Sequence, residues 1–241
     1  MRVLVLYAHP VETSFGAAVH ATLVKTLRAG GHAVDDCDLN AEGFDPVMSR
    51  QDRIDYHDVT VNRTRVAPYV ERVLNCEAMV FSYPIWNQGF PAILKGFVDK
   101  VFLPGVTFSM KDNGDYVPTM RHVKRLGAAC TYGGDRFRTM LMGDPCRRVV
   151  TRSLRATCAP GARCDYVAIY DMNHTSALFA LVNVHAAGGR KPPDCLRHSE
   201  AYSPFRRSSA SCAPTSTMRP LSSTIRRSIA AMVDRRWASA A

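Results

Sequence analysis

The chain has 241 residues, 46% hydrophobic and 22% charged, which is the composition of a soluble globular protein and the length of one domain with extra segments. No apolar run approaches the ~18–20 residues of a membrane span, and the apolar start lacks a cleavage site, so we expect a cytoplasmic protein without a transmembrane segment. Segment 182–241 holds ten basic and three acidic residues, which is +7 of the net charge of +10, and a charge confined to the tail argues against a nucleic-acid partner.

The first part of the chain has the pattern of a βαβ unit. Residues 2–7 form a continuous apolar run, which predicts a strand buried on both faces of a parallel sheet. A polar loop leads to a helix over 15–28 that Ser14 caps and Gly30 ends, and a second strand is expected over 32–39. Residues 40–62 are polar and irregular, and a helix is expected over 64–75.

The alternation of strands and helices continues after residue 77. A third strand covers 78–83, and the chain turns at Pro84 because proline cannot continue a central strand. Pro91 suits the first position of a helix that runs to about Leu103, and turn signals over 104–118 predict a small hairpin. A fourth strand at 126–130, a basic helix near 145–157 and a fifth strand at 164–170 follow. The prediction is an α/β fold with a doubly wound, five-stranded parallel sheet in flavodoxin order and ligand loops at the strand C-termini.

The composition changes near residue 175. We expect one α/β domain over 1–175 and an atypical, basic, Ser/Pro/Arg-rich tail over 176–241 that is poorly ordered. Residues 222–237 are different, because their apolar side chains share one helical face opposite arginines: Ile225, Ile229, Met232, Val233 and Trp237. This pattern predicts a docking or membrane-surface helix, unless it arose by chance in a disordered tail.

The eight cysteines are scattered along the chain. None forms a C-x-x-C pair, and no set of cysteines and histidines has the spacing of zinc ligands, so no metal site is predicted. In a cytoplasmic protein we expect these thiols to be reduced and mostly structural.

The first candidate binding segment, residues 8–16, links the first strand to the first helix. A helix start offers unpaired N–H groups and about half a positive charge, which suits a phosphate. Ser14 can add a hydroxyl, and His9 can add a donor or a positive charge. A helix cap and a buried loop histidine would have the same sequence, and the segment contains neither a G-x-G-x-x-G nor a G-x-x-x-x-G-K-[ST] motif.

Two further candidate segments follow the third and fourth strands. Residues 83–97 bring an aromatic side chain, two amides and a glycine to one strand end, where they can border a flat heteroaromatic ring; Trp86 alone is more typical of packing. In residues 131–136, Gly133 and Gly134 let the backbone approach a ligand, and their N–H groups can stabilise negative charge on it. A simple tight turn is the alternative interpretation of the two glycines.

Together these segments resemble the NAD(P)H:quinone oxidoreductase family of the flavodoxin-like superfamily, and the resemblance covers about residues 1–175, including 38–46 and 95–102. It implies a homodimer with active sites at the interface, a tightly bound FAD (alternatively FMN), and NAD(P)H as cosubstrate. It also implies three groups of flavin contacts: the phosphates at His9, Ser14, Phe15 and Gly16; the isoalloxazine at Pro84, Ile85, Trp86, Asn87 and Gln88; and its pyrimidine edge at Thr131, Tyr132, Gly133 and Gly134.

The chain departs from the family pattern in two places. Quinone reductases of animals carry a tyrosine and a histidine after the glycine loop, whereas residues 135–144 contain neither and resemble the bacterial short-chain branch. Arg136 can supply positive charge instead, so we predict Gly133, Gly134 and Arg136 as the catalytic residues. After residue 175, relatives should form a last amphipathic helix over the sheet, but this chain has an apolar run at 176–182 and then the basic tail.

The sequence therefore predicts an NAD(P)H dehydrogenase (quinone)-like flavoenzyme. It would pass two electrons as hydride from NAD(P)H through the bound flavin to quinone-like or other small-molecule acceptors. Two alternatives stay open. One is a flavin-binding regulatory subunit of a membrane transporter, and the other is a non-functional product whose C-terminus was frameshifted.

Overall fold

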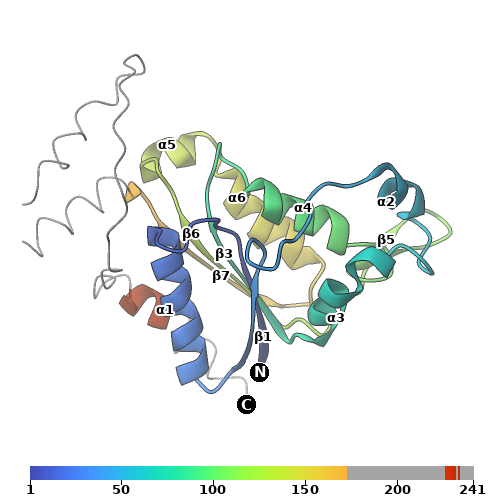
Figure 1. Cartoon of the computed structure of the whole chain (residues 1–241), viewed down its shortest axis with the longest axis horizontal. Coiled ribbons are helices and arrows are strands. Elements are labelled where there is room, and N and C mark those ends of the chain that lie inside the picture. The colour runs from blue at the N-terminus through green and yellow to red at the C-terminus, as the bar shows by residue number, and fades with distance from the viewer. Residues whose placement is uncertain (173–225, 232, 234–241) are drawn as a thin grey trace, which may run out of the picture.

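The computed structural model describes residues 1–172, 226–231 and 233, which form a sheet with helices on both faces (Figure 1). The main sheet has five strands: β1 (Arg2–Tyr7), β2 (Ala33–Asp38), β3 (Ala78–Pro84), β6 (Arg125–Thr131) and β7 (Arg163–Ile169). They are parallel and stand in the order β2-β1-β3-β6-β7. This is the flavodoxin order, so the predicted fold class is confirmed.

The burial of the central strands explains why the sequence predicted them. All seven residues of β3 and all seven of β6 are buried, as continuous apolar runs in a central position require. The edge strand β2 is more exposed, and its adjacent residues Asp36 and Asp35 point to opposite faces of the sheet, where His20 of α1 and Arg72 of α3 bind them. Charged residues on an edge strand also discourage pairing with another chain.

The helices and the small hairpin lie between these strands. Their bounds are α1 (Phe15–Ala29), α2 (Arg50–Asp55), α3 (Ala67–Asn75) after a 3-10 turn (Thr64–Val66), α4 (Ala92–Val101), β4 (Phe108–Met110), β5 (Tyr116–Pro118), α5 (Arg136–Leu141) and α6 (Pro145–Arg148), which continues as a π-helical turn (Val149–Leu154). The predicted hairpin over 104–118 is confirmed, and Gly114 at its tip has a φ of 84°, which favours glycine.

Three local predictions were wrong in detail. Pro84 does not turn the chain: it is the last residue of β3, opposite Thr131, where its missing N–H costs nothing. Pro91 is the N-cap of α4 rather than its first residue. The irregular stretch 40–62 contains α2, which the capping box of Ser49 and Asp52 starts. The basic helix expected near 145–157 is confirmed as α6 and its continuation, but the sequence did not predict α5, which Asp144 in a left-handed conformation separates from α6.

Two apolar clusters lie on opposite faces of the sheet. On one face, Val3, Val5 and Val80 pack against α1, whose buried residues include Leu23 and Leu27. On the other face, the strand residues Leu4, Leu6, Met79 and Phe81 pack against α3, α4 and α6. These helices contribute Val70, Phe97 and Cys146 to the same cluster. Figure 1 shows α1 on one side of the sheet and α3, α4 and α6 on the other.

A helical piece near the C-terminus covers part of the α1 face. Residues 226–231 and 233 are helical, and Ile229 and Val233 are 0% and 1% exposed within the cluster of Val3, Val5 and α1. This piece lies inside the predicted helix 222–237, and its two buried apolar side chains face the protein. The boundary predicted at 175/176, residues 173–225 and the rest of the tail lie outside the described residues.

No helix in the described part of the chain is long and apolar enough to cross a lipid bilayer.

Candidate functional site

The three predicted binding segments meet at one edge of the sheet. They leave the carboxyl ends of β1, β3 and β6, which are neighbours in the sheet order, and α5 lies at the same end of the molecule (Figure 1). Ligands of open parallel sheets bind at this edge.

The segment after β1 presents the start of α1. Ser14 is its N-cap, and its Oγ accepts a hydrogen bond from the N–H of Ala17 at 3.0 Å. The earlier N–H groups, of Phe15 and Gly16, have no acceptor within a helix, and no acidic side chain occupies the first turn. The side chain of Phe15 packs against the α1-side cluster, so only its main chain can face a ligand.

His9 lies beside this helix start. Its Nδ1 accepts a hydrogen bond from the N–H of Val11 at 3.0 Å, which leaves Nε2–H as a donor in the neutral ring. Partial burial lowers the pKa of His9, so at neutral pH the ring is a neutral donor rather than a positive charge. A Cβ at Gly16 would lie 3.4 Å from Cδ2 of His9, which shows how closely this ring approaches the helix.

The segment after β3 is a tight turn from Trp86 to Gly89. Trp86 and Gly89 exchange two main-chain hydrogen bonds of 3.2 and 2.8 Å, and between them Asn87 and Gln88 have positive φ angles of 49° and 61°. Left-handed backbone at a glutamine is uncommon, and such conformations cluster at ligand-binding sites. Oε1 of Gln88 is buried and has no hydrogen-bond partner among the described residues.

Trp86 connects the first two segments. Its ring meets His9 edge-on, with 6.0 Å between ring centroids, and its side chain stays 45% exposed at the strand ends. Pro84 is buried and Ile85 packs against the core, so their side chains support the turn from below. The residues of this segment that can face a ligand are therefore Trp86, Asn87 and Gln88.

The segment after β6 exposes two adjacent main-chain donors. The carbonyls of Tyr132 and Gly134 accept hydrogen bonds from Met172 and Asp171, both 3.0 Å long, which hold the loop against the end of β7. Within the described residues, the N–H groups of Gly133 and Gly134 donate to no acceptor. A Cβ at Gly133 would meet nothing within 4 Å, so the space in front of this loop is open.

A buried hydrogen-bond network holds the glycine loop from behind. The hydroxyl of Tyr132 donates to Oδ1 of Asp144 at 2.7 Å and lies 2.6 Å from the hydroxyl of Tyr166 on β7. The ring of Tyr132 also stacks on Tyr170, with centroids 4.6 Å apart. Burial raises the pKa of both Tyr132 and Tyr166, so these hydroxyls stay protonated and continue to donate. The predicted flavin contact Tyr132 is thus only 2% exposed, and its side chain supports the loop rather than facing a ligand.

We expect Tyr132→Phe to lower the free energy of unfolding by about 1.5–3 kcal/mol, because the carboxylate of Asp144 loses the short hydrogen bond that the Tyr132 hydroxyl donates. Chemical denaturation of the two proteins measures this difference. Tyr116→Phe is the matched control, since Tyr116 is 68% exposed, and it should change stability by less than about 0.5 kcal/mol. Equal losses of stability in the two variants would show that the hydrogen bonds of Tyr132 do not support the glycine loop.

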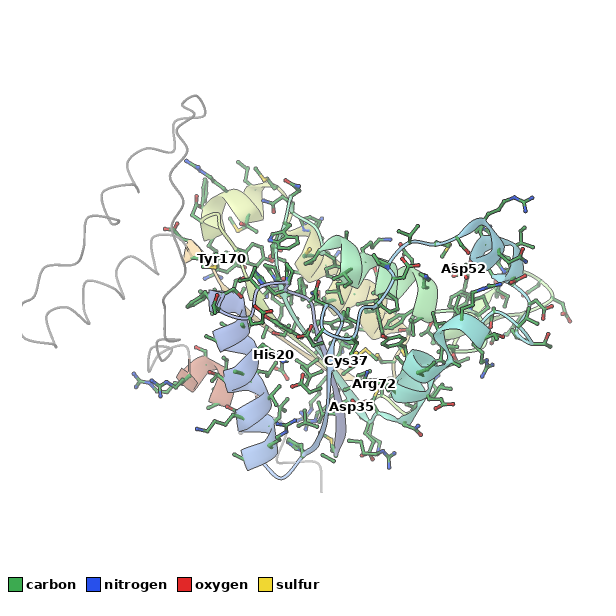
Figure 2. All side chains as sticks on the ribbon, viewed as in Figure 1. His20, Asp35, Cys37, Asp52, Arg72 and Tyr170 are labelled. Atoms are coloured by element: carbon green, nitrogen blue, oxygen red, sulfur yellow. The ribbon has the colours of Figure 1, made fainter. Side chains whose placement is uncertain are left out.

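Arg136 and its neighbours form the far side of the site. Arg136 is the first residue of α5, directly after the glycine loop, and it lines a hollow with arginines of α6 and its continuation. Tyr170 lines the same hollow and lies beside α5 in Figure 2. Three apolar side chains of α5 are also exposed, since Phe137, Met140 and Leu141 are 69%, 65% and 78% exposed.

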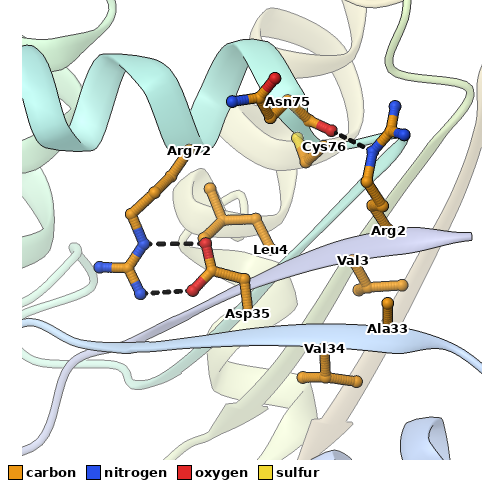
Figure 3. A pocket seen from close by; sticks show the side chains of 9 residues that line it. All are labelled: Arg2, Val3, Leu4, Ala33, Val34, Asp35, Arg72, Asn75 and Cys76. Atoms are coloured by element: carbon orange, nitrogen blue, oxygen red, sulfur yellow. Dashed lines mark hydrogen bonds and ion pairs between the residues drawn. The ribbon is translucent and has the colours of Figure 1, made fainter.

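A second hollow, of about 290 Å³, lies away from this edge (Figure 3). It is enclosed by the first residues of β1, by β2 and by the end of α3, among them Arg2, Val34 and Cys76. Arg72 at its rim is bound by both carboxylate oxygens of Asp35 and by Glu42. These ion pairs fasten α3 to the edge strand, which is a structural role.

Sequence reasoning missed several residues of the site. It did not find Asp144, Tyr166, Tyr170 or the arginines of α6, because no motif links residues that are 12 and 34 positions apart. A polar side chain directly before Pro145, at a helix start, was the one available signal for Asp144.

Comparisons with known proteins agree with this architecture. A family model described as a flavodoxin-like fold matches residues 1–159. The chain is 30% identical over 134 residues to NAD(P)H dehydrogenase (quinone) 1 of Cavia porcellus, over 48% of this chain and 49% of the relative. It is 26% identical over 146 residues to the uncharacterized NAD(P)H oxidoreductase YcaK of Escherichia coli (strain K12), over 59% of this chain and 69% of the relative.

Among solved structures, Smu.1420 from Streptococcus mutans UA159 matches with a TM-score of 0.57 and 26% identity, over 76% of this chain and 98% of that chain. The chain spans about half the length of the first of the curated relatives, so the match concerns the domain that carries the three segments. Because the family model covers more than half of the chain, the chain belongs to this flavodoxin-like family, in agreement with its resemblance to the NAD(P)H:quinone oxidoreductases.

Proposed function

We propose that this protein is a flavin-dependent NAD(P)H oxidoreductase that passes two electrons, as hydride, from NAD(P)H to quinone-like or other small acceptors. One observation carries the proposal. The N–H groups of Gly133 and Gly134 lack an acceptor among the described residues, and the space beside Gly133 is open at the sheet edge where α1 begins and Trp86 is exposed. Relatives named NAD(P)H dehydrogenase and NAD(P)H oxidoreductase support the same activity.

The residues at this edge fit a flavin. The N–H groups of Phe15 and Gly16, with Ser14 and Nε2–H of His9, would hold its phosphates. Trp86, Asn87 and the unpartnered Oε1 of Gln88 would border the ring, whose carbonyls and N–H groups need complementary partners. We propose FAD, with FMN as the alternative, since the same phosphate and ring contacts serve both.

The protein's part in catalysis would be positioning and electrostatics. A bound flavin supplies the chemistry of accepting and donating hydride. The N–H groups of Gly133 and Gly134 would stabilise negative charge at the pyrimidine edge, and donors fixed in this way need no reorganisation. Arg136 at the start of α5 would add positive charge to the same side. The exposed rings of Trp86 and Phe137 would exclude water from stacked reactants.

We expect Gly133→Val to weaken flavin binding at least about tenfold while leaving folding intact. The side chain would enter space that nothing in the described structure fills, so it meets the ligand and not the protein. Titration of the apoprotein with FAD and with FMN, followed by visible absorbance, measures the loss, and an unchanged unfolding midpoint is the control. A colourless wild-type protein that binds neither flavin would overturn the proposal.

Turnover separates an enzyme from a flavin-binding regulatory subunit. With the flavin bound, steady-state oxidation of NADH and NADPH should be fast with menadione as the acceptor. A protein that holds flavin but oxidises neither at an appreciable rate would favour the regulatory role.

We also propose a homodimer. A broad, mostly apolar hollow of about 590 Å³ lies between α2, α4 and the hairpin, lined in part by Tyr56, Val98 and Phe108. Nearby Met110 is 44% exposed, and a second copy of the chain would cover it. Light scattering of the purified protein tests this, and a monomer at micromolar concentration would contradict it.

A further inference from the structure

Four arginines surround one hollow beside the candidate site. It has a volume of about 270 Å³ and is lined by Arg136, Arg147, Arg148 and Arg152, with Thr151 and Tyr170 between them. The arginines come from the start of α5, from α6 and from its π-helical continuation, so two separate elements converge on it. We refer to it as the arginine hollow.

Within the described residues, none of these four guanidinium groups forms an ion pair with a carboxylate. Elsewhere the chain neutralises its clustered charges: Arg65 binds Asp52 and Asp55, and Arg72 binds Asp35 and Glu42. In the described part of the chain, the arginine hollow thus concentrates positive charge without a paired carboxylate, which is the electrostatic setting of an anion site.

One acidic residue lines the hollow, and its position is fixed. Asp144 accepts a hydrogen bond from the hydroxyl of Tyr132 and is 3.4 Å from the N–H of Arg147. Four guanidinium groups against one carboxylate leave an excess of three positive charges. The same bond joins the hollow to the glycine loop, so an anion there would lie next to the edge proposed to hold the flavin ring.

The sheet order separates this hollow from the proposed seat of the flavin phosphates. That seat follows β1, the ring lies at β3 and β6, and the hollow lies beyond β6 on the side of β7. Strands lie about 4.8 Å apart, so β1 and β7 are separated by roughly 14 Å. The hollow is therefore on the far side of the ring, where the adenosine half of a stacked nicotinamide dinucleotide can extend.

We propose that the arginine hollow binds the 2′-phosphate of NADPH and makes NADPH the preferred reductant; this rests on the proposed function. A phosphate monoester carries a charge of about −1.5 to −2 near pH 7 and three strong acceptor oxygens, which match planar, bidentate guanidinium donors. NADH lacks this group. NADH and NADPH both contain the diphosphate, so contacts with the diphosphate cannot distinguish NADPH from NADH.

The test uses the flavin-loaded enzyme and the variants Arg148→Gln, Arg152→Gln and the double variant. Arg138→Gln removes the same charge from a neighbouring exposed position that pairs with Asp135 and does not line the hollow, so it is the matched control. Each single variant should raise the KM for NADPH about tenfold and leave the KM for NADH within about twofold, as expected for the loss of a charged hydrogen bond.

Direct binding provides a readout besides activity. Calorimetry should show that adenosine 2′,5′-bisphosphate binds the wild-type protein at least about tenfold more tightly than adenosine 5′-phosphate, and that the double variant loses this difference while Arg138→Gln keeps it. This result holds even if turnover fails, so it is distinguishable from a failure of the proposed function.

Three outcomes would overturn the proposal. Equal increases of the KM for NADPH and NADH would assign the hollow to the diphosphate that both share. Loss of FAD but not of FMN from the double variant would assign it to the flavin diphosphate. Equal binding of the two adenosine phosphates to the wild-type protein would leave no phosphate site in the hollow.

Discussion

Replacing Ile229 by aspartate is expected to lower the free energy of unfolding by about 4 kcal/mol, because the change removes a buried apolar side chain and puts a carboxylate in its place. Ile229 is 0% exposed and packs in the same cluster as Val3, Val5 and α1. The new carboxylate would lie among the apolar side chains of this cluster, so it must be protonated or the helical piece must leave the sheet.

Chemical denaturation of the full chain measures this loss. Ser228→Asp is the control, since it introduces the same side chain at the adjacent, exposed position of the same helical piece. It should change stability by less than about 0.5 kcal/mol. If Ile229→Asp is as stable as Ser228→Asp, residues 226–233 do not brace the sheet in solution.

Gly96→Ala should lower the free energy of unfolding by about 3 kcal/mol, although alanine is the better helix former by about 0.5–1 kcal/mol. A Cβ at Gly96 would lie 2.3 Å from the carbonyl oxygen of Pro46 and 2.5 Å from its Cα. Backbone atoms cannot rotate away as a flexible side chain can, so α4 and the segment after β2 must move apart. Lys100, one turn further along, donates to the carbonyls of Asp45 and Val47 and would be displaced with them.

The unfolding midpoint of Gly96→Ala, compared with that of Gly30→Ala, measures this cost. At Gly30 the same methyl group would lie 3.4 Å or more from its neighbours, which is ordinary contact, and φ is −76°. We expect Gly30→Ala to be nearly neutral. Similar midpoints for the two variants would show that α4 can shift at little cost.

The sequence predicted those parts of the fold that local pattern determines. Continuous apolar runs identified β1, β3 and β6, because a central parallel strand is buried on both faces and shows no alternation. The short helices were harder to predict from the sequence. In α2, none of the six residues is buried, so there was no apolar period to detect, and only its cap marks it.

The candidate site was likewise predictable in part. The loops at the strand ends were predictable, because the order of the strands brings residues 77 positions apart, His9 and Trp86, to one edge. Side-chain direction was not predictable. Tyr132 directly follows β6, where the ligand loop begins. Its side chain nevertheless points inward, because its hydroxyl binds Tyr166 and its ring stacks on Tyr170. The arginine hollow depends on the left-handed conformation of Asp144 between α5 and α6, and the polar residue before Pro145 indicates a helix start there but not that conformation.

The helical piece at 226–233 affects how the protein is made as well as how stable it is. Ile229 is synthesised 60 residues after β7 ends at Ile169, so the five strands can pair while one face of the sheet is still partly uncovered. During that interval, the part of this apolar cluster that Ile229 and Val233 complete remains available to other chains, and exposed apolar surface of this kind promotes aggregation. The yield of soluble protein should therefore depend on how soon the last segment is released from the ribosome, and a chain shortened before residue 226 should precipitate more readily than it loses the arrangement of its strands.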